Sequence, residues 1–213
     1  MTRQALVDIR GILLDLDETL YSRQEGFSTW LESEARERDA FDKLDRARVA
    51  ELDQRGRGDK DALLEYFDAV FDWRESQPER LQRFRTGLTK AIRLPPDVRE
   101  LLLRLGQEFR LGLVTNGTAA TQRAKLQALG VARLFDPVVI SEEVGFRKPD
   151  ARIFELAIAN WAIPSASVLF VGDDLICDIQ GAKAAGMRAL QVGAEPGISS
   201  ISELEGWLRE SIT

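Results

Sequence analysis

A pair of aspartates that could carry phosphoryl-transfer chemistry follows the first apolar stretch of the chain. Residues 9–14 read Ile-Arg-Gly-Ile-Leu-Leu, and Asp15 and Asp17 come directly after them. In an extended chain, residues i and i+2 point to the same side, so both carboxylates can face one reacting group. One carboxylate can attack phosphorus while the other gives a proton to the leaving oxygen and later takes one from water. The spacing predicts these two roles for the pair.

A hydroxyl, an amide and a glycine follow a second apolar stretch, as Thr115, Asn116 and Gly117. A predicted helix begins shortly after them, and backbone N–H groups at a helix N-terminus bind phosphate well. Thr and Asn also cap helices without any ligand. In the company of the aspartate pair, the three residues predict a phosphate-binding turn.

Charged residues close the third and fourth apolar stretches. Lys148 supplies a compact positive charge suited to a phosphoryl oxygen. Asp173 and Asp174 are adjacent acids, which repel one another unless a cation or a lysine compensates them. Asp173 could bind a metal, and Asp178 could brace that metal or hold Lys148, whereas Asp174 also suits a helix cap. Such carboxylates predict a hard cation such as Mg²⁺.

Short apolar runs alternate with helical patterns along the chain, which predicts an α/β fold with a doubly wound, Rossmann-like parallel sheet. Ligands of such sheets bind beyond the carboxyl ends of the strands, where the polar residues above are expected. The predicted strands are 9–15, 111–115, 138–141, 168–171 and 189–192, and the predicted helices are 97–105, 119–129, 151–161, 177–185 and 202–209.

A segment without strand patterns interrupts this alternation after the first strand. Within residues 22–94, apolar residues recur at helical spacing, as at Phe27, Trp30 and Leu31. The sequence predicts a small all-helical cap domain at 22–94, inserted into a core domain formed by 1–21 and 95–213.

The composition excludes several classes of site. The chain has no histidine, so it has no Ser-His-Asp triad and no His-ligated zinc site. Its net charge is −6, with basic and acidic residues interleaved, which is unfavourable for binding a nucleic-acid polymer. No apolar run approaches the roughly 20 residues of a membrane span, and no secretory signal is visible. With a single cysteine, Cys177, we expect a cytoplasmic protein; whether it is a monomer or a homodimer stays open.

The four motifs, in this order, resemble those of the haloacid dehalogenase (HAD) superfamily of hydrolases. The resemblance covers residues 9–20 and 97–195 and implies that Asp15 is the nucleophile and Asp17 the acid and base. It also implies that Mg²⁺ is held by the Asp15 carboxylate, the Asp17 backbone carbonyl and Asp173. Thr115 and Lys148 would bind the phosphoryl oxygens.

Further expectations come from the same resemblance. Asp178 would be a supporting carboxylate, and the helical insert is similar to a C1-type cap that closes over small substrates. Glu18 stands where many members have glycine, which could alter the turn between Asp17 and Thr19. Arg23, near the first hinge of the cap, is the best candidate for a substrate contact, the alternative being a solvated turn.

The expected activity is Mg²⁺-dependent hydrolysis of phosphate monoesters of small metabolites through an aspartyl-phosphate. A 2-haloacid dehalogenase is an alternative, but such enzymes lack the second aspartate because halide needs no proton. A phosphonatase would use a cap lysine as a Schiff base, and Lys43, Lys60 and Lys90 have no recognisable setting for it. A non-catalytic phospho-metabolite-binding protein is the remaining alternative.

Overall fold

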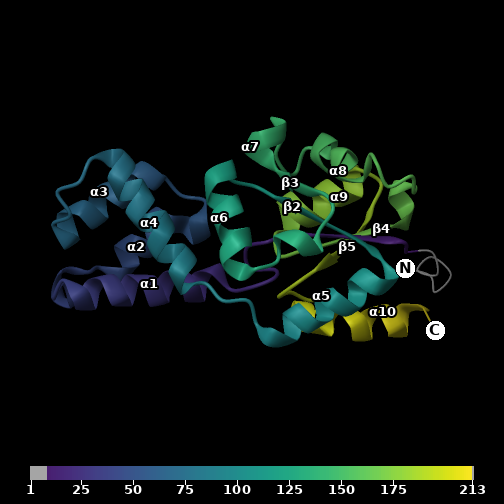
Figure 1. Ribbon diagram of the computed structural model, residues 1–213, viewed down its shortest axis with the longest axis horizontal. Helices are drawn as coiled ribbons and strands as arrows, with labels where there is room; N and C mark the ends of the chain where they lie inside the picture. The colour runs from purple at the N-terminus through teal and green to yellow at the C-terminus, as the bar shows by residue number, and fades with distance from the viewer. Residues whose placement is uncertain (1–8, 213) are drawn as a thin grey trace. The chain divides into compact units, whose positions relative to one another are not determined.

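The protein separates into two compact units, which the structure, a computed structural model, describes over residues 9–212 (Figure 1). Ser22–Arg93 form one unit, and the described residues on either side of this segment form the other. Each unit has its own buried apolar residues, so each is presented by itself below.

A five-stranded parallel sheet is the centre of the unit made by the two flanking segments. Its order is β3-β2-β1-β4-β5, and all five strands occur where the sequence predicts them. Because the strands are parallel, their carboxyl ends share one edge of the sheet. The strands are β1 (Gly11–Leu14), β2 (Arg110–Thr115), β3 (Val138–Ile140), β4 (Val168–Gly172) and β5 (Arg188–Gln191).

Helices cover both faces of this sheet, which confirms the predicted doubly wound architecture (Figure 1). On one face, Phe154 of α8 packs edge-on against Phe170 of β4, with ring centroids 5.0 Å apart. The opposite face is covered by α5 and α10. The helices of this unit are α5 (Pro96–Glu108), α6 (Ala119–Leu129), α7 (Ser141–Val144), α8 (Ala151–Ile158), α9 (Gly181–Ala184) and α10 (Leu204–Ile212).

Two predicted helices differ from the structure. The helix predicted at 151–161 ends at Ile158, and Trp161 instead turns inward, where its indole N–H donates to the Asp136 carbonyl at 2.9 Å. The helix predicted at 177–185 is a π-helix, Leu175–Gln180, followed by the short α9. π-Helical turns are rare and frequently lie at functional sites, and this one follows the acidic motif at the end of β4.

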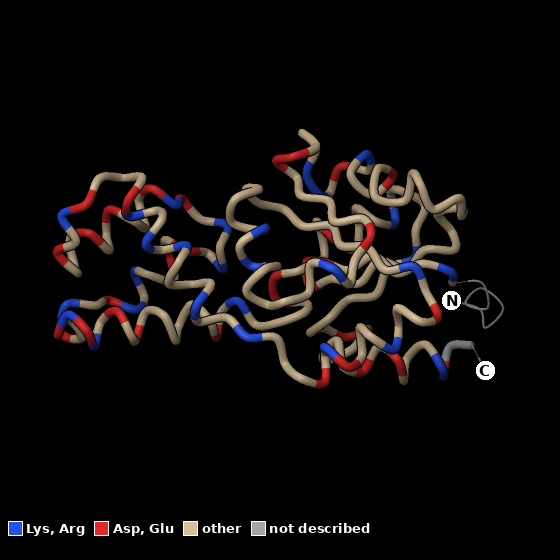
Figure 2. Tube along the Cα trace, viewed as in Figure 1, with Lys and Arg blue, Asp and Glu red and all other residues tan. Residues whose placement is uncertain are grey.

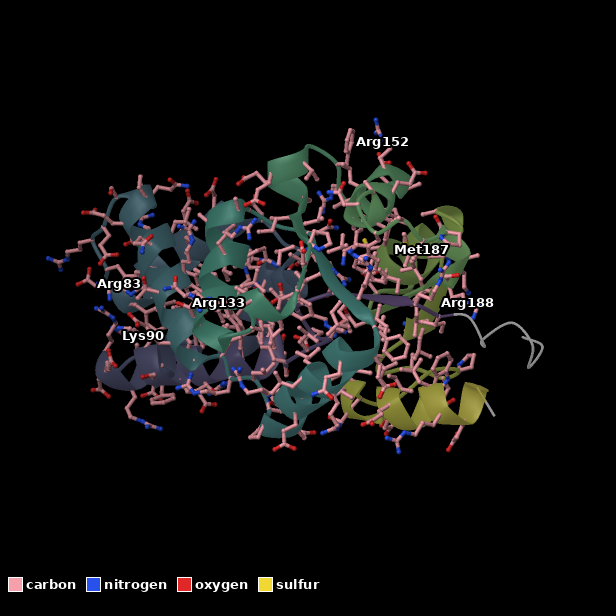
Figure 3. All side chains as sticks on the ribbon, turned by 45° about the vertical axis from the view of Figure 1, so that its right-hand side comes forward. Arg83, Lys90, Arg133, Arg152, Met187 and Arg188 are labelled. Atoms are coloured by element: carbon pink, nitrogen blue, oxygen red, sulfur yellow. The ribbon has the colours of Figure 1, made fainter. Side chains whose placement is uncertain are left out.

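The unit Ser22–Arg93 is helical, and all of its residues are described without a strand among them. Its core is aromatic, with Trp30 of α1 packed edge-on against Phe84 of α4 at a centroid distance of 5.0 Å. On α4, Arg83 pairs with Glu75 and lies over the Trp73 ring (Figure 3). Its helices are α1 (Arg23–Glu37), α2 (Arg46–Asp53), α3 (Lys60–Phe71) and α4 (Gln77–Ala91), with short 3-10 turns at Phe41–Lys43 and Gln54–Gly56.

Charged residues of both signs are interspersed along the helices of each unit (Figure 2). Across residues 9–212, the structure contains no helix long and apolar enough to cross a membrane.

Candidate active site

A buried ion-pair cluster lies at the carboxyl ends of β1 and β4. The Lys148 ammonium is 2.5 Å from Asp15 Oδ1 and 2.6 Å from Asp178 Oδ1, and all three side chains are buried. Asp15 follows β1 directly, Lys148 lies between α7 and α8, and Asp178 lies on the π-helix after β4. Three segments far apart in sequence thus place two carboxylates next to one ammonium group.

A third carboxylate joins this cluster. Oxygen atoms of Asp15, Asp173 and Asp178 all lie within 4.8 Å of one another. Burial raises the pKa of Asp15, Lys148 opposes that shift, and repulsion from Asp178 and Asp17 adds to it, so the pKa of Asp15 rises to about 7. The cluster therefore holds more negative charge than Lys148 balances. A donor set made only of carboxylate oxygens fits Mg²⁺, a hard cation that would supply the missing positive charge.

For Lys148, unlike Asp15, the neighbouring charges have a larger effect on the pKa than burial has. Burial alone lowers it, but the Asp15 and Asp178 carboxylates outweigh burial and raise the pKa of Lys148 above its ordinary value. Lys148 therefore carries its positive charge at every physiological pH. Its backbone is held as well, because the Asn116 side chain accepts a hydrogen bond from Lys148 N at 2.9 Å and donates to Lys148 O at 3.0 Å.

The glycine at the end of β4 makes room for Asp178. A Cβ on Gly172 would lie 2.3 Å from Asp178 Oδ2, closer than real atoms approach. The same Oδ2 accepts a hydrogen bond from Asp174 N at 3.1 Å. Asp174 itself caps the π-helix, its carboxylate accepting from Ile176 N and Cys177 N at 2.8 Å each. Asp174 thus has the capping contacts anticipated as its alternative role.

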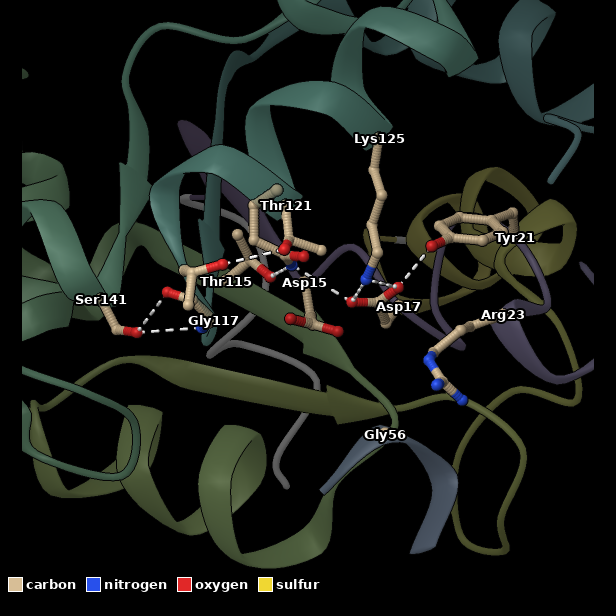
Figure 4. Close-up of polar contacts among 12 residues, drawn as sticks. Asp15, Asp17, Tyr21, Arg23, Gly56, Thr115, Gly117, Thr121, Lys125 and Ser141 are labelled. Carbon is tan, nitrogen blue, oxygen red and sulfur yellow. Dashed lines mark hydrogen bonds and ion pairs between the residues drawn. The ribbon is translucent and has the colours of Figure 1, made fainter. Parts of the chain in front are cut away.

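The Asp17 carboxylate is contacted by side-chain donors, among them Lys125 and Tyr21 (Figure 4). Lys125 Nζ lies 2.8 Å from Oδ1 and 2.7 Å from Oδ2, the Tyr21 hydroxyl donates to Oδ1, and Gln122 Nε2 donates to Oδ2 at 3.1 Å. Burial by itself raises the pKa of Asp17. The Lys125 charge and the hydrogen bonds from Lys125, Tyr21 and Gln122 outweigh burial and lower the pKa to about 2.

The predicted phosphate-binding turn makes contacts of its own with the protein. The Thr115 hydroxyl is buried and accepts a hydrogen bond from Gln122 Nε2 at 2.6 Å. The Asn116 amide is committed to Lys148, and Gly117 N donates to the Ser141 hydroxyl at 3.0 Å. Phosphate contacts of Thr115, Asn116 and Gly117 stay predictions. Glu18 takes a φ of 60°, a left-handed conformation that glycine adopts without strain.

Arg23 is buried within the helical unit. Its guanidinium donates to Asp53 at 2.8 and 2.7 Å, and the two residues are 4% and 2% exposed. The guanidinium also lies 5.1 Å from the centre of the Phe27 ring. The alternative expectation of a solvated turn is therefore wrong for Arg23, because the residue is buried. Its contact with a substrate stays a prediction.

Sequence reasoning missed the residues around Asp17. On α6 the buried positions are Gln122, Lys125, Leu126 and Leu129. They recur at helical spacing, so a glutamine and a lysine occupy the stripe of α6 that faces inward. Two polar residues inside an apolar stripe, directly after a phosphate-binding motif, are the signal that could have revealed them.

Residues 12–192 match the sequence profile of haloacid dehalogenase-like hydrolases. The chain belongs to this family. The resemblance deduced from the four motifs is thereby confirmed.

Relatives within the family carry phosphatase names. The chain is 31% identical to a ribulose-1,5-bisphosphate 5-phosphatase of Halopiger xanaduensis over 84% of this chain and 83% of that protein. It is 42% identical to a glyceraldehyde 3-phosphate phosphatase of Methanopyrus kandleri, over 46% of this chain and 42% of that protein. A phosphoserine phosphatase of Thermus thermophilus is 34% identical over 59% and 58% of the two chains. The chain thus covers less than two thirds of the glyceraldehyde 3-phosphate and phosphoserine phosphatases.

Solved structures of the family share the fold. A magnesium-bound HAD hydrolase, YfnB of Bacillus subtilis, superimposes with a TM-score of 0.74 at 24% identity, over 94% of this chain and 99% of that one. A HAD phosphatase of Thermococcus onnurineus gives a TM-score of 0.64 at 25% identity, over 94% and 98%. The α/β fold predicted from the sequence is the fold of these relatives.

Proposed function

We propose that this family member hydrolyses phosphate monoesters of small metabolites, with Asp15 as the nucleophile and Mg²⁺ as cofactor. The observation that carries the proposal is the cluster of Asp15, Asp173 and Asp178, two of which, Asp15 and Asp178, pair with the ammonium of Lys148. Such a cluster can receive a cation and a phosphoryl group at the same strand ends. The phosphatase names of the relatives support the same class of reaction.

The Asp15 carboxylate, the Asp17 backbone carbonyl and Asp173 would hold the metal. When bound, Mg²⁺ neutralises charge on the phosphoryl oxygens and on the carboxylates that surround them. Asp178 would support Lys148, which it already contacts at 2.6 Å.

The reaction would proceed in two displacements at phosphorus. Asp15 attacks the phosphorus atom, the P–O bond to the ester oxygen breaks, and Asp17 gives that oxygen its proton. A water then attacks the aspartyl-phosphate, the proton lost by that water returns to Asp17, and Asp15 and phosphate are released. Lys148 would bind the phosphoryl oxygens through both steps, and Thr115 would assist it.

The low pKa of Asp17 bears on these two steps. A carboxylate that keeps its charge suits the second displacement, in which Asp17 takes a proton. For the first displacement, Asp17 must carry a proton.

We also propose that Ser22–Arg93 act as a cap that selects the substrate. Such a cap leaves room for a small metabolite and little for a phosphoprotein loop or a nucleic-acid chain. Lys60 is a poor Schiff-base candidate because it lies 3.5 Å from Asp53 and over the Phe84 ring. The single cysteine supports a cytoplasmic setting for the enzyme.

Phosphate release tests this function directly. The protein would be assayed with Mg²⁺ against p-nitrophenyl phosphate, sugar phosphates, nucleoside monophosphates and short phospho-acids, with Asp15→Asn as the matched control. We expect turnover by the parent only, and rapid-quench mass spectrometry should find the phosphoryl group on Asp15. Release of halide from a 2-haloacid, with no phosphate from any ester, would establish the dehalogenase instead. Ligand binding without any turnover would establish the non-catalytic alternative.

A further inference from the structure

The Asp17 carboxylate is held by side-chain donors from two parts of the chain. Both of its oxygens accept hydrogen bonds, and Lys125 reaches both of them, at 2.8 and 2.7 Å. Lys125 is 4% exposed, although lysine normally lies in solvent. Burying an ammonium is costly unless a partner compensates it, and Asp17 is the partner within its reach.

The donors come from two different segments. Tyr21 lies four residues after Asp17, whereas Gln122 and Lys125 lie on α6, one turn apart. Gln122 also donates to the Thr115 hydroxyl at 2.6 Å, so a single amide joins Thr115 to Asp17. Two of the three donor residues thus lie on α6, whose N-terminus follows the predicted phosphate-binding turn.

We propose that Lys125 is a positioning residue, which with Gln122 and Tyr21 sets the orientation of the Asp17 carboxylate for proton transfer. The inference rests on the proposed phosphatase function and deepens it. Lys125 acts through Asp17 and touches no reacting atom. The alternative is that the Lys125–Asp17 pair only ties α6 to the β1 end of the sheet.

Leaving groups of different basicity separate these two roles. A p-nitrophenolate leaves without a proton, so phosphorylation of Asp15 by p-nitrophenyl phosphate does not need Asp17, whereas hydrolysis of the aspartyl-phosphate does. An alkoxide needs a proton, so an alkyl phosphate requires Asp17 in both displacements. A loss of stability alone would affect both esters equally.

The test compares Lys125→Met and Lys125→Arg with the parent. For Lys125→Met we expect kcat on an alkyl phosphate to fall about 100-fold with KM within about threefold, as for a lost acid–base function. With p-nitrophenyl phosphate we expect a burst of one p-nitrophenolate per enzyme, followed by slow turnover. Lys125→Arg should recover part of kcat because it restores a cationic donor. Lys183→Met, the same change on the exposed face of α9, should match the parent.

Several results would overturn the inference. One is a folded Lys125→Met that keeps the parent kcat on both esters; another is an equal loss on both esters without a burst. If Lys125→Met does not fold, Tyr21→Phe removes one Asp17 donor with little change in volume, and it should show a weaker burst of the same kind. A crystal structure of the variant that folds gives a readout independent of turnover, and an unmoved Asp17 side chain there would refute the positioning role. If the parent releases no phosphate from any ester, the phosphatase function fails, and this crystal structure still decides the inference.

Discussion

The Lys148 ammonium lies 2.5 Å from Asp15 Oδ1, although 133 positions separate the two residues in the chain. Asp15 directly follows the central strand β1, and Lys148 lies in the connection between α7 and α8. A buried pair of this kind is sensitive to the loss of either partner, because the remaining charge is then uncompensated.

Replacement of Lys148 should remove most of the activity. In Lys148→Ala we expect kcat to fall about 10³-fold, because a charged donor to the phosphoryl oxygens is lost in a sheltered site. Steady-state phosphate release measures the effect, and thermal melting shows whether the variant folds. Lys183→Ala is the control for a lysine on the surface. A folded Lys148→Ala within tenfold of the parent would remove Lys148 from the catalytic set.

Magnesium should stabilise the folded protein through Asp173. A cation that binds only the native state adds about 2.7 kcal/mol at a concentration of 100 Kd. We expect a rise in Tm when MgCl₂ is added to chelator-treated protein and none in Asp173→Asn. Asp42→Asn, an exposed acid of the helical unit, should respond like the parent. An equal rise in Asp173→Asn would place the cation elsewhere.

Asp15 should make the free energy of unfolding of the metal-free protein decrease as the pH is raised from about 4 to about 7. Its folded pKa is about 7, above the ordinary 3.8, so in this window the folded state binds more protons than the unfolded state. Asp15→Asn should abolish this contribution, which makes the variant more stable than the parent by a few kcal/mol at pH 8 but not at pH 4. Urea unfolding in EDTA across this range measures the difference. A constant difference between variant and parent would show that burial does not raise the Asp15 pKa.

Arg23 should matter for the stability of the helical unit more than for substrate binding. Arg23→Met leaves the Asp53 carboxylate, 2% exposed, without its closest cation, and we expect a loss of about 3 kcal/mol. Chemical denaturation followed by tryptophan fluorescence reports on the unit, because Trp30 and Trp73 lie in its core. A variant with parental stability and a KM raised more than tenfold would instead establish Arg23 as a substrate contact.

Much of the fold could be predicted from the sequence, because the apolar patterns that indicate strands and helices involve only residues close together in the chain. Five buried strands and the helical character of residues 22–93 follow from apolar periodicity, and the strand-end acids follow from the topology of a parallel sheet. The π-helix at Leu175–Gln180 could not be predicted, and within it Asp178 contacts Lys148 and Asp174 N. Periodicity contains no information about such a contact.

The roles of single polar residues also depend on contacts that join distant segments. By itself the sequence determined which acids stand at the strand ends, since their spacing from the apolar runs is local. Only the tertiary structure decided that Lys125 of α6 reaches Asp17, that Asn116 holds the Lys148 backbone, and that Arg23 is buried against Asp53. The physical reason is that a long flexible side chain can take many partners, and packing of the elements around it selects one.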